Sequence, residues 1–172
     1  MAPTQPDSQN VLYTRASSSK PRTGFSMLRS RAALVTRRRR MEILATFLGS
    51  KAFVITGPPK WNALGLGATA MFVPTLAYNQ KRTGEFVFDG RRFLLRRVQF
   101  PENPSPEWFV VDLLQHHDMA SVSMTDLRER LVTTLRAGRW SRQRLRDMAG
   151  QYGTKATLAL VEQCFREAGD LP

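Results

Sequence analysis

The stretch Phe53–Leu95 decides the fold, with three diagnostic segments: FVITGPPKWNALGLG at 53–67, YNQKR at 78–82 and FVFDGRRFLL at 86–95. The apolar run Ala52–Thr56 is typical of a strand. Gly57-Pro58-Pro59 ends that strand, because proline cannot donate to a sheet ladder, and Pro59 suits the first turn of a helix. The sequence therefore predicts a strand, a tight turn and a short helix whose buried side holds Trp61, Leu64 and Leu66.

A β-hairpin follows. Asp89-Gly90 is the strongest short hairpin signal, because both central residues of such a turn must tolerate positive φ. This turn would pair Phe88 with Arg91 and Phe86 with Phe93. Strand alternation then places Phe86, Phe88, Phe93 and Leu95 on one face of the hairpin. The opposite face carries Val87, Arg92, Leu94 and Arg96. Another strand is expected over 72–79, where Pro74 favours an edge strand or a bulge.

Helical periodicity dominates the rest of the domain. Before the first strand, Met41–Leu48 repeats apolar residues at helical spacing, and Gly49 stands where a C-terminal cap belongs. After Pro101–Pro106, helix signals begin at Ser105, Ser123, Ser141 and Thr154. The predicted fold class is α+β: a small antiparallel sheet with a β-hairpin, followed by a C-terminal group of about four helices.

Length and charge predict one domain with a basic tail. The chain has 172 residues and a net charge of +12. Residues 1–40 hold nine Lys/Arg and one acid, and residues 1–24 include few large apolar groups. We therefore expect a basic, disordered tail over 1–40 and a domain over 41–168. A positive field of this kind favours polyanions or acidic proteins as partners.

Nothing in the sequence favours an enzyme, a metal site or a cofactor site. His116 and His117 are adjacent and point about 100° apart on a helix, so they do not share one ion easily. No Ser nucleophile motif is present. The single Cys164 lies on an apolar helical pattern and is expected to be a buried small hydrophobe rather than a reactive thiol. Without a signal peptide or an apolar run long enough for a bilayer, we expect a cytoplasmic protein with no membrane partner.

Basic residues are the remaining candidates, and we assign them to nucleic-acid binding because Arg and Lys suit phosphate oxygens. Six lie on the hairpin or the turn before it, and two lie one helical turn apart near the C-terminus: Lys81, Arg82, Arg91, Arg92, Arg96, Arg97, Arg142 and Arg146. The alternative for the hairpin set is charge that protects a sheet edge from aggregation. The alternative for Arg142 and Arg146 is a solvated helix face.

The order of these motifs resembles the C-terminal domain of AbiEi-like antitoxins of type IV, abortive-infection toxin–antitoxin systems. The similar features are the Gly-Pro-x-x-Trp-Asn-Ala-Leu-Gly-Leu helix, the Tyr-Asn-x-Lys-Arg strand end and the Gly-Arg-Arg-Phe hairpin arm, and they extend roughly from Met41 to Phe165. The resemblance implies a regulatory module that counters a nucleotidyltransferase-like toxin. It also implies a contribution to DNA binding and to autoregulation of transcription.

The residues before this domain depart from the family pattern. In AbiEi-like proteins a winged helix-turn-helix precedes the domain, whereas here about forty residues of unsuitable composition precede it. We therefore expect a solitary or truncated antitoxin domain. The alternative is a general nucleic-acid-binding protein that uses the Arg tail and the basic hairpin.

Overall fold

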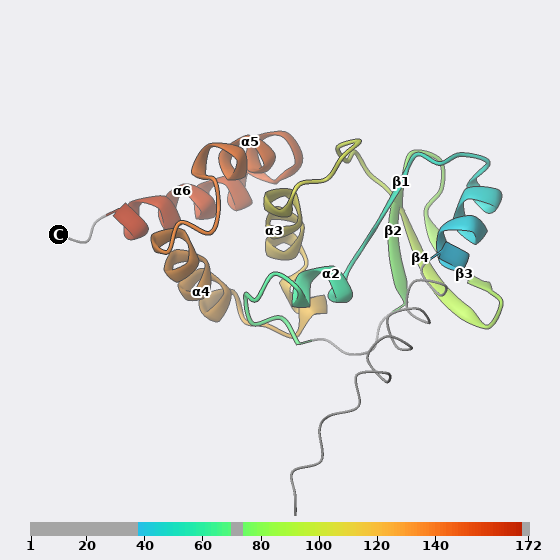
Figure 1. Cartoon of the computed structure of the whole chain (residues 1–172), viewed down its shortest axis with the longest axis horizontal. Helices are drawn as coiled ribbons and strands as arrows, with labels where there is room; N and C mark the ends of the chain where they lie inside the picture. Colours follow the sequence, from blue (N-terminus) through green and yellow to red (C-terminus); the bar gives the residue numbers. More distant parts are fainter. Residues whose placement is uncertain (1–37, 70–73, 170–172) are drawn as a thin grey trace, which may run out of the picture. The chain divides into compact units, whose positions relative to one another are not determined.

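The structure is a computed structural model that describes residues 38–69 and 74–169. Of the tail predicted over 1–40, residues 1–37 lie outside these ranges, whereas 38–40 are helical; the first two residues of the strand expected over 72–79 also lie outside them. From Met41 onward the chain forms one compact unit. This unit is an α+β domain in which a four-stranded sheet meets a group of helices (Figure 1).

The sheet is mixed, with strand order β1-β2-β4-β3. Its strands are β1 (Phe53–Thr56), β2 (Thr75–Asn79), β3 (Gly84–Phe88) and β4 (Arg91–Arg97). β1 and β2 are antiparallel, as are β3 and β4, whereas β2 and β4 are parallel. The prediction of an antiparallel sheet was therefore wrong for the central pair. The hairpin arm folds back so that β4, rather than β3, contacts β2.

The hairpin itself has the predicted register. Phe88 pairs with Arg91 and Phe86 pairs with Phe93. Asp89 and Gly90 both have positive φ, at 52° and 69°, as this turn requires. The edge prediction for Pro74 was wrong, because β2 lies inside the sheet. Pro74 immediately precedes the first residue of β2, so it takes no donor away from the ladder.

Each face of the sheet contributes to a separate hydrophobic core. On one face, the helix at residues 38–48 contributes Leu44 and Leu48, which are buried in a cluster with Phe93 and Leu95 of β4. The other face packs against α2 (Pro58–Asn62) and α3 (Pro106–Gln115). Strand alternation supplies both cores from the same strands.

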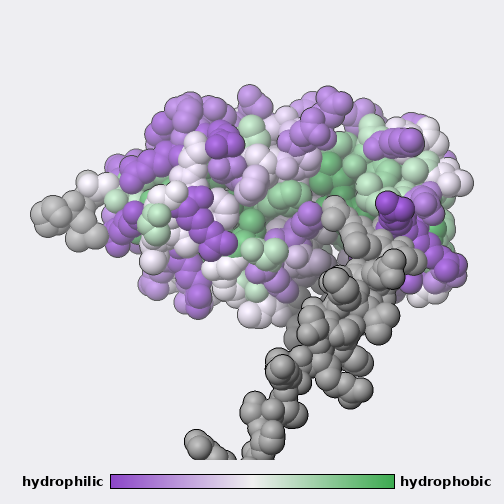
Figure 2. Space-filling view, viewed as in Figure 1, coloured by the Kyte–Doolittle hydropathy of each residue, from purple (hydrophilic) through white to green (hydrophobic). Residues whose placement is uncertain are grey.

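The predicted C-terminal helices are present and begin at the expected caps. They are α3, α4 (Met124–Arg136), α5 (Arg142–Tyr152) and α6 (Lys155–Gly169), with a 3-10 turn at His117–Ala120. The side chains of Ser105, Ser123 and Ser141 each accept from a backbone N–H of the first turn. In the view of Figure 2, hydrophilic side chains cover much of the outer surface of this helical group.

The larger core lies between the sheet and these helices. Trp61 and Leu66 are fully buried there, and Leu64 nearly so, as the motif predicted. Cys164 is fully buried, and burial raises the pKa of its thiol to about 11, as expected of a small hydrophobe. Within the described ranges, every helix is too short or too polar to cross a bilayer.

Candidate functional site

A buried carboxylate organises the larger core. Asp112 of α3 is 3% exposed. Its Oδ2 accepts from Trp61 Nε1 at 2.8 Å and from the Thr56 hydroxyl, and its Oδ1 accepts from the Tyr78 hydroxyl at 2.6 Å. The three donors come from α2, β1 and β2. A buried charge is tolerated only with such partners, so Asp112 joins these elements to α3.

His116 lies one helical turn after Asp112 and extends the network. Its Nδ1 is 2.9 Å from the Asp112 carbonyl oxygen and 3.4 Å from Asp112 Oδ1. Both neighbours are acceptors, so Nδ1 carries a proton and donates. The ring also stacks on Trp61, with centroids 5.8 Å apart and planes 10° apart. Nε2 is left to face Arg96 and the Tyr78 hydroxyl.

The network shifts two pKa values. Burial lowers the pKa of His116, but the hydrogen bonds and the charge of Asp112 outweigh burial, so that the pKa is raised overall. Burial also raises the pKa of Tyr78, and the charge of Asp112 adds to that increase. The phenol therefore stays protonated and acts as a donor to Asp112.

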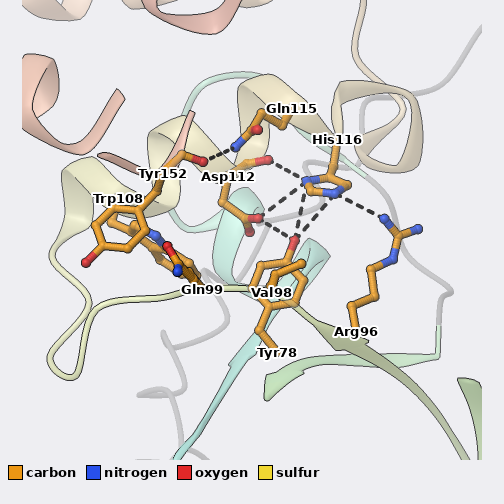
Figure 3. A pocket seen from close by; sticks show the side chains of 9 residues that line it. All are labelled: Tyr78, Arg96, Val98, Gln99, Trp108, Asp112, Gln115, His116 and Tyr152. Atoms are coloured by element: carbon orange, nitrogen blue, oxygen red, sulfur yellow. Dashed lines mark hydrogen bonds and ion pairs between the residues drawn. The ribbon is translucent and has the colours of Figure 1, made fainter. Parts of the chain in front are cut away.

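A cavity of about 180 Å³ opens beside this network (Figure 3). Arg96 and His116 lie on one side of it, while Trp108 and Tyr152 lie on the other. Gln115 is held in place by a hydrogen bond from its Nε2 to the Tyr152 carbonyl oxygen, at 3.3 Å. The complete lining is Tyr78, Arg96, Val98, Gln99, Trp108, Asp112, Gln115, His116 and Tyr152.

The structure divides the six predicted hairpin residues between two ends of the sheet. Arg91 and Arg92 begin β4, whereas Arg96 and Arg97 end it, and Arg91 lies about 20 Å from Arg97 at the rise of a strand. Because β2 and β4 are parallel, Asn79 pairs with Arg97. The turn that follows β2 therefore lies at the same end of the sheet as Arg97.

Lys81 and Arg82, in the turn after β2, have local structural partners. Asn79 is buried, and its Oδ1 accepts from the backbone N–H groups of Lys81 and Arg82 at 2.8 and 2.7 Å. Lys81 Nζ donates to the Leu48 carbonyl oxygen at 2.7 Å, so it caps the helix at residues 38–48. The Arg82 guanidinium lies over the Phe47 ring, 4.7 Å from its centroid.

Three of the other predicted residues contact protein groups. Arg92 pairs with Glu85 at 2.8 Å. Arg146 makes two hydrogen bonds to Glu162, and Arg142 lies over the Phe165 ring and contacts the Phe165 carbonyl oxygen. The Arg146 pair raises the pKa of the guanidinium and lowers the pKa of the Glu162 carboxyl. Two of these cations therefore have their charge offset by a neighbouring acid.

Sequence reasoning missed Asp112, although a signal was present. Asp112 is the acid that interrupts the apolar run WFVVDLL of α3, and His116 follows it at the spacing that places both on one helix face. From the sequence, His116 was considered as a metal ligand together with His117, whereas its side chain is 18% exposed and belongs to the network. The donors Thr56, Trp61 and Tyr78 come from distant parts of the chain, so helix spacing alone does not identify them.

Among the described residues, no group of three His, Cys, Asp or Glu side chains has the arrangement to hold a metal ion. The chain matches no protein-family model, no curated protein and no solved structure.

Proposed function

We propose that this protein is an antitoxin-type regulatory module that binds nucleic acid through one end of its sheet. The observation that carries the proposal is a convergence of exposed cations, called here the basic end: Lys51, Lys81, Arg82 and Arg97. Lys51 precedes β1, Lys81 and Arg82 follow β2, and Arg97 ends β4. The register places these positions together, because Asn79 pairs with both Phe53 and Arg97.

No acidic side chain in the described part of the chain offsets the charge of the basic end. None of its four residues forms an ion pair with a described carboxylate, in contrast to Arg92 and Arg146. When such residues neutralise phosphates they release counterions and make affinity depend on salt. The basic end therefore has the charge needed to bind a polyanion, and Arg91 at the hairpin turn is a separate, weaker candidate.

The antitoxin part of the proposal is supported by the role of the motif residues in the fold. Trp61 of the helix motif and Tyr78 of the strand-end motif meet on the same carboxylate, Asp112. The motif is thus a set of mutually dependent core residues. Its resemblance to AbiEi-like antitoxins supports a common scaffold whose surface carries the regulatory function.

Nucleic-acid binding is tested in the full chain with two matched sets of substitutions. The first set is Lys51→Gln, Arg82→Gln and Arg97→Gln, which spares Lys81 because that residue caps a helix. The control set, Arg92→Gln, Arg146→Gln and Lys155→Gln, removes the same charge elsewhere. Duplex DNA affinity is measured against salt concentration. The first set should flatten the salt slope by up to about 0.9 for each phosphate that is no longer neutralised, and the control set should flatten it less.

Equal reductions of affinity in the two sets would show that net charge, rather than the basic end, drives binding, and would contradict this part of the proposal. Antitoxin action is tested by co-expression with a nucleotidyltransferase-like toxin encoded beside the chain, scored as rescue of growth. Rescue supports the regulatory role. Failure of rescue together with retained DNA binding would favour the alternative, a general nucleic-acid-binding protein.

A further inference from the structure

We propose that the cavity beside Asp112 is a binding site for a phosphate monoester, held by Arg96 and His116. The proposal does not rest on the nucleic-acid surface described above. Arg96 and Arg97 are consecutive on β4, so they point to opposite faces of the sheet. Arg97 belongs to the basic end, whereas Arg96 lines the cavity on the α3 side.

Two nitrogen groups converge at the side of the cavity drawn in Figure 3. Arg96 Nη1 lies 3.5 Å from His116 Nε2. Nδ1 of His116 already donates towards the carbonyl and carboxylate of Asp112, so protonation of the ring adds an N–H at Nε2, directed towards a guanidinium. An oxyanion in the cavity, beside the two nitrogens rather than between them, would accept from both groups, and charge-assisted binding of phosphate uses this arrangement.

The charges around His116 are compatible with an anion. The ionisable groups that face it are Tyr78 from β2, Arg96 from β4 and Asp112 from α3. Both oxygens of Asp112 accept from other donors, and the Tyr78 phenol remains protonated. With His116 protonated, the group carries two positive charges and one negative charge. Burial and the charge of Arg96 lower the pKa of His116, whereas the hydrogen bonds and the charge of Asp112 raise it overall.

The remainder of the cavity fits the ester group. A volume of about 180 Å³ is larger than a phosphate needs, and the additional space is lined by Trp108, Tyr152 and the amides of Gln99 and Gln115. An aromatic and amide lining suits a polar organic group attached to the phosphate. A phosphate monoester is close to a dianion near neutral pH, so it matches the adjacent cationic donors better than a carboxylate does.

The direct test is a titration of the full chain with inorganic phosphate at neutral pH. Binding is measured by calorimetry and by the NMR signals of the His116 ring. Arg96→Gln should weaken phosphate binding about tenfold or more, since the variant lacks a hydrogen bond between charged groups. Arg92→Gln is the matched control, because Arg92 lies on the same face of β4 but pairs with Glu85. This control should bind phosphate as the unaltered protein does.

Folding is checked by the thermal midpoint, and Arg96→Lys provides a second variant that keeps the charge but loses the guanidinium fork. Arg96→Lys should bind phosphate with intermediate affinity. No binding to the unaltered protein at millimolar phosphate would overturn the proposal, as would equal affinity of the Arg96→Gln and Arg92→Gln variants. The basic-end substitutions should leave phosphate binding unchanged, so this test and the nucleic-acid test can fail independently.

The phosphate could belong to a free nucleotide or to the end of a strand. A single-stranded oligonucleotide with and without a 5′-phosphate is compared with a nucleoside monophosphate and its nucleoside. If the phosphate increases affinity only for the nucleoside, the site binds a free nucleotide. If the 5′-phosphate increases affinity for the oligonucleotide and Arg96→Gln removes that increase, the site binds the end of a strand. If the phosphate increases affinity in neither pair, the result contradicts a phosphate-monoester site.

Discussion

Asp112 places an acid inside an apolar core, and the arrangement holds because its donors are rigid. The indole of Trp61 is fully buried, and the phenol of Tyr78 is 4% exposed. Packing restricts both side chains, so their hydrogen bonds to Asp112 cost little additional side-chain entropy. The network therefore determines how α2, β1 and β2 pack against α3. Burial of the surrounding apolar side chains provides stability in addition.

Trp61 is the residue whose removal should disturb this core most. Trp61→Ala should lower the free energy of unfolding by about 3–5 kcal/mol, because it leaves a cavity and also removes a donor to Asp112. Denaturant unfolding measures the change. The control Val87→Ala alters a side chain that is 66% exposed and should remain within about 0.5 kcal/mol. Similar values for the two variants would contradict a structural role for Trp61.

His116 should make stability depend on pH. Its pKa in the folded protein is raised above the ordinary value of 6.5. A raised folded pKa adds stability that is fully present below the unfolded pKa and is lost as pH rises through the folded pKa. The stability difference between the unaltered protein and His116→Gln should therefore be largest below about pH 6.5 and should shrink at higher pH. Urea unfolding across this range checks the sign, and a difference that grows with pH would contradict it.

At the scale of elements, local signals predicted what local interactions determine. Gly49, Asp89-Gly90 and the serine caps act within a few residues of their own positions, and all were confirmed. The parallel pairing of β2 with β4 joins segments separated by the hairpin arm, and no local pattern specifies which arm pairs inward. For the same reason, the basic residues were predicted as one hairpin surface, whereas the sheet order separates Arg91 from Arg97.

The helix at residues 38–48 should depend on Lys81, a residue that the sequence suggested only for nucleic-acid binding. Lys81 Nζ reaches the terminal carbonyl groups of Leu48 and Gly49. Lys81→Met should lower the free energy of unfolding by about 0.5–1 kcal/mol, because it removes a cation from a helix C-terminus. Lys155→Met, in an exposed first turn, is the control and should have little effect. No difference between these variants would assign Lys81 to the surface alone.

At the scale of the whole domain, one sheet contributes to two cores that do not merge. The tryptophans Trp61, Trp108 and Trp140 all belong to the larger core, whereas Phe93 belongs to the smaller one on the opposite face. Phe93 also pairs through the sheet with Thr75 of β2, next to residues that face the larger core. The strands therefore connect the two cores mechanically, and the distribution of tryptophans gives a probe for only one of them.

This arrangement predicts that the two cores unfold together. Phe93→Ala should lower the free energy of unfolding by about 3–5 kcal/mol, because it empties a fully buried position of the smaller core. If the sheet couples the cores, tryptophan fluorescence should report the full shift and should coincide with far-UV circular dichroism in a single denaturant transition. Val87→Ala, on the neighbouring edge strand, should leave both signals in place. In Phe93→Ala, the fluorescence midpoint could instead stay constant while the circular dichroism midpoint falls. This result would show that the larger core is stable without the smaller core. The sheet would then transmit no cooperativity between its two faces.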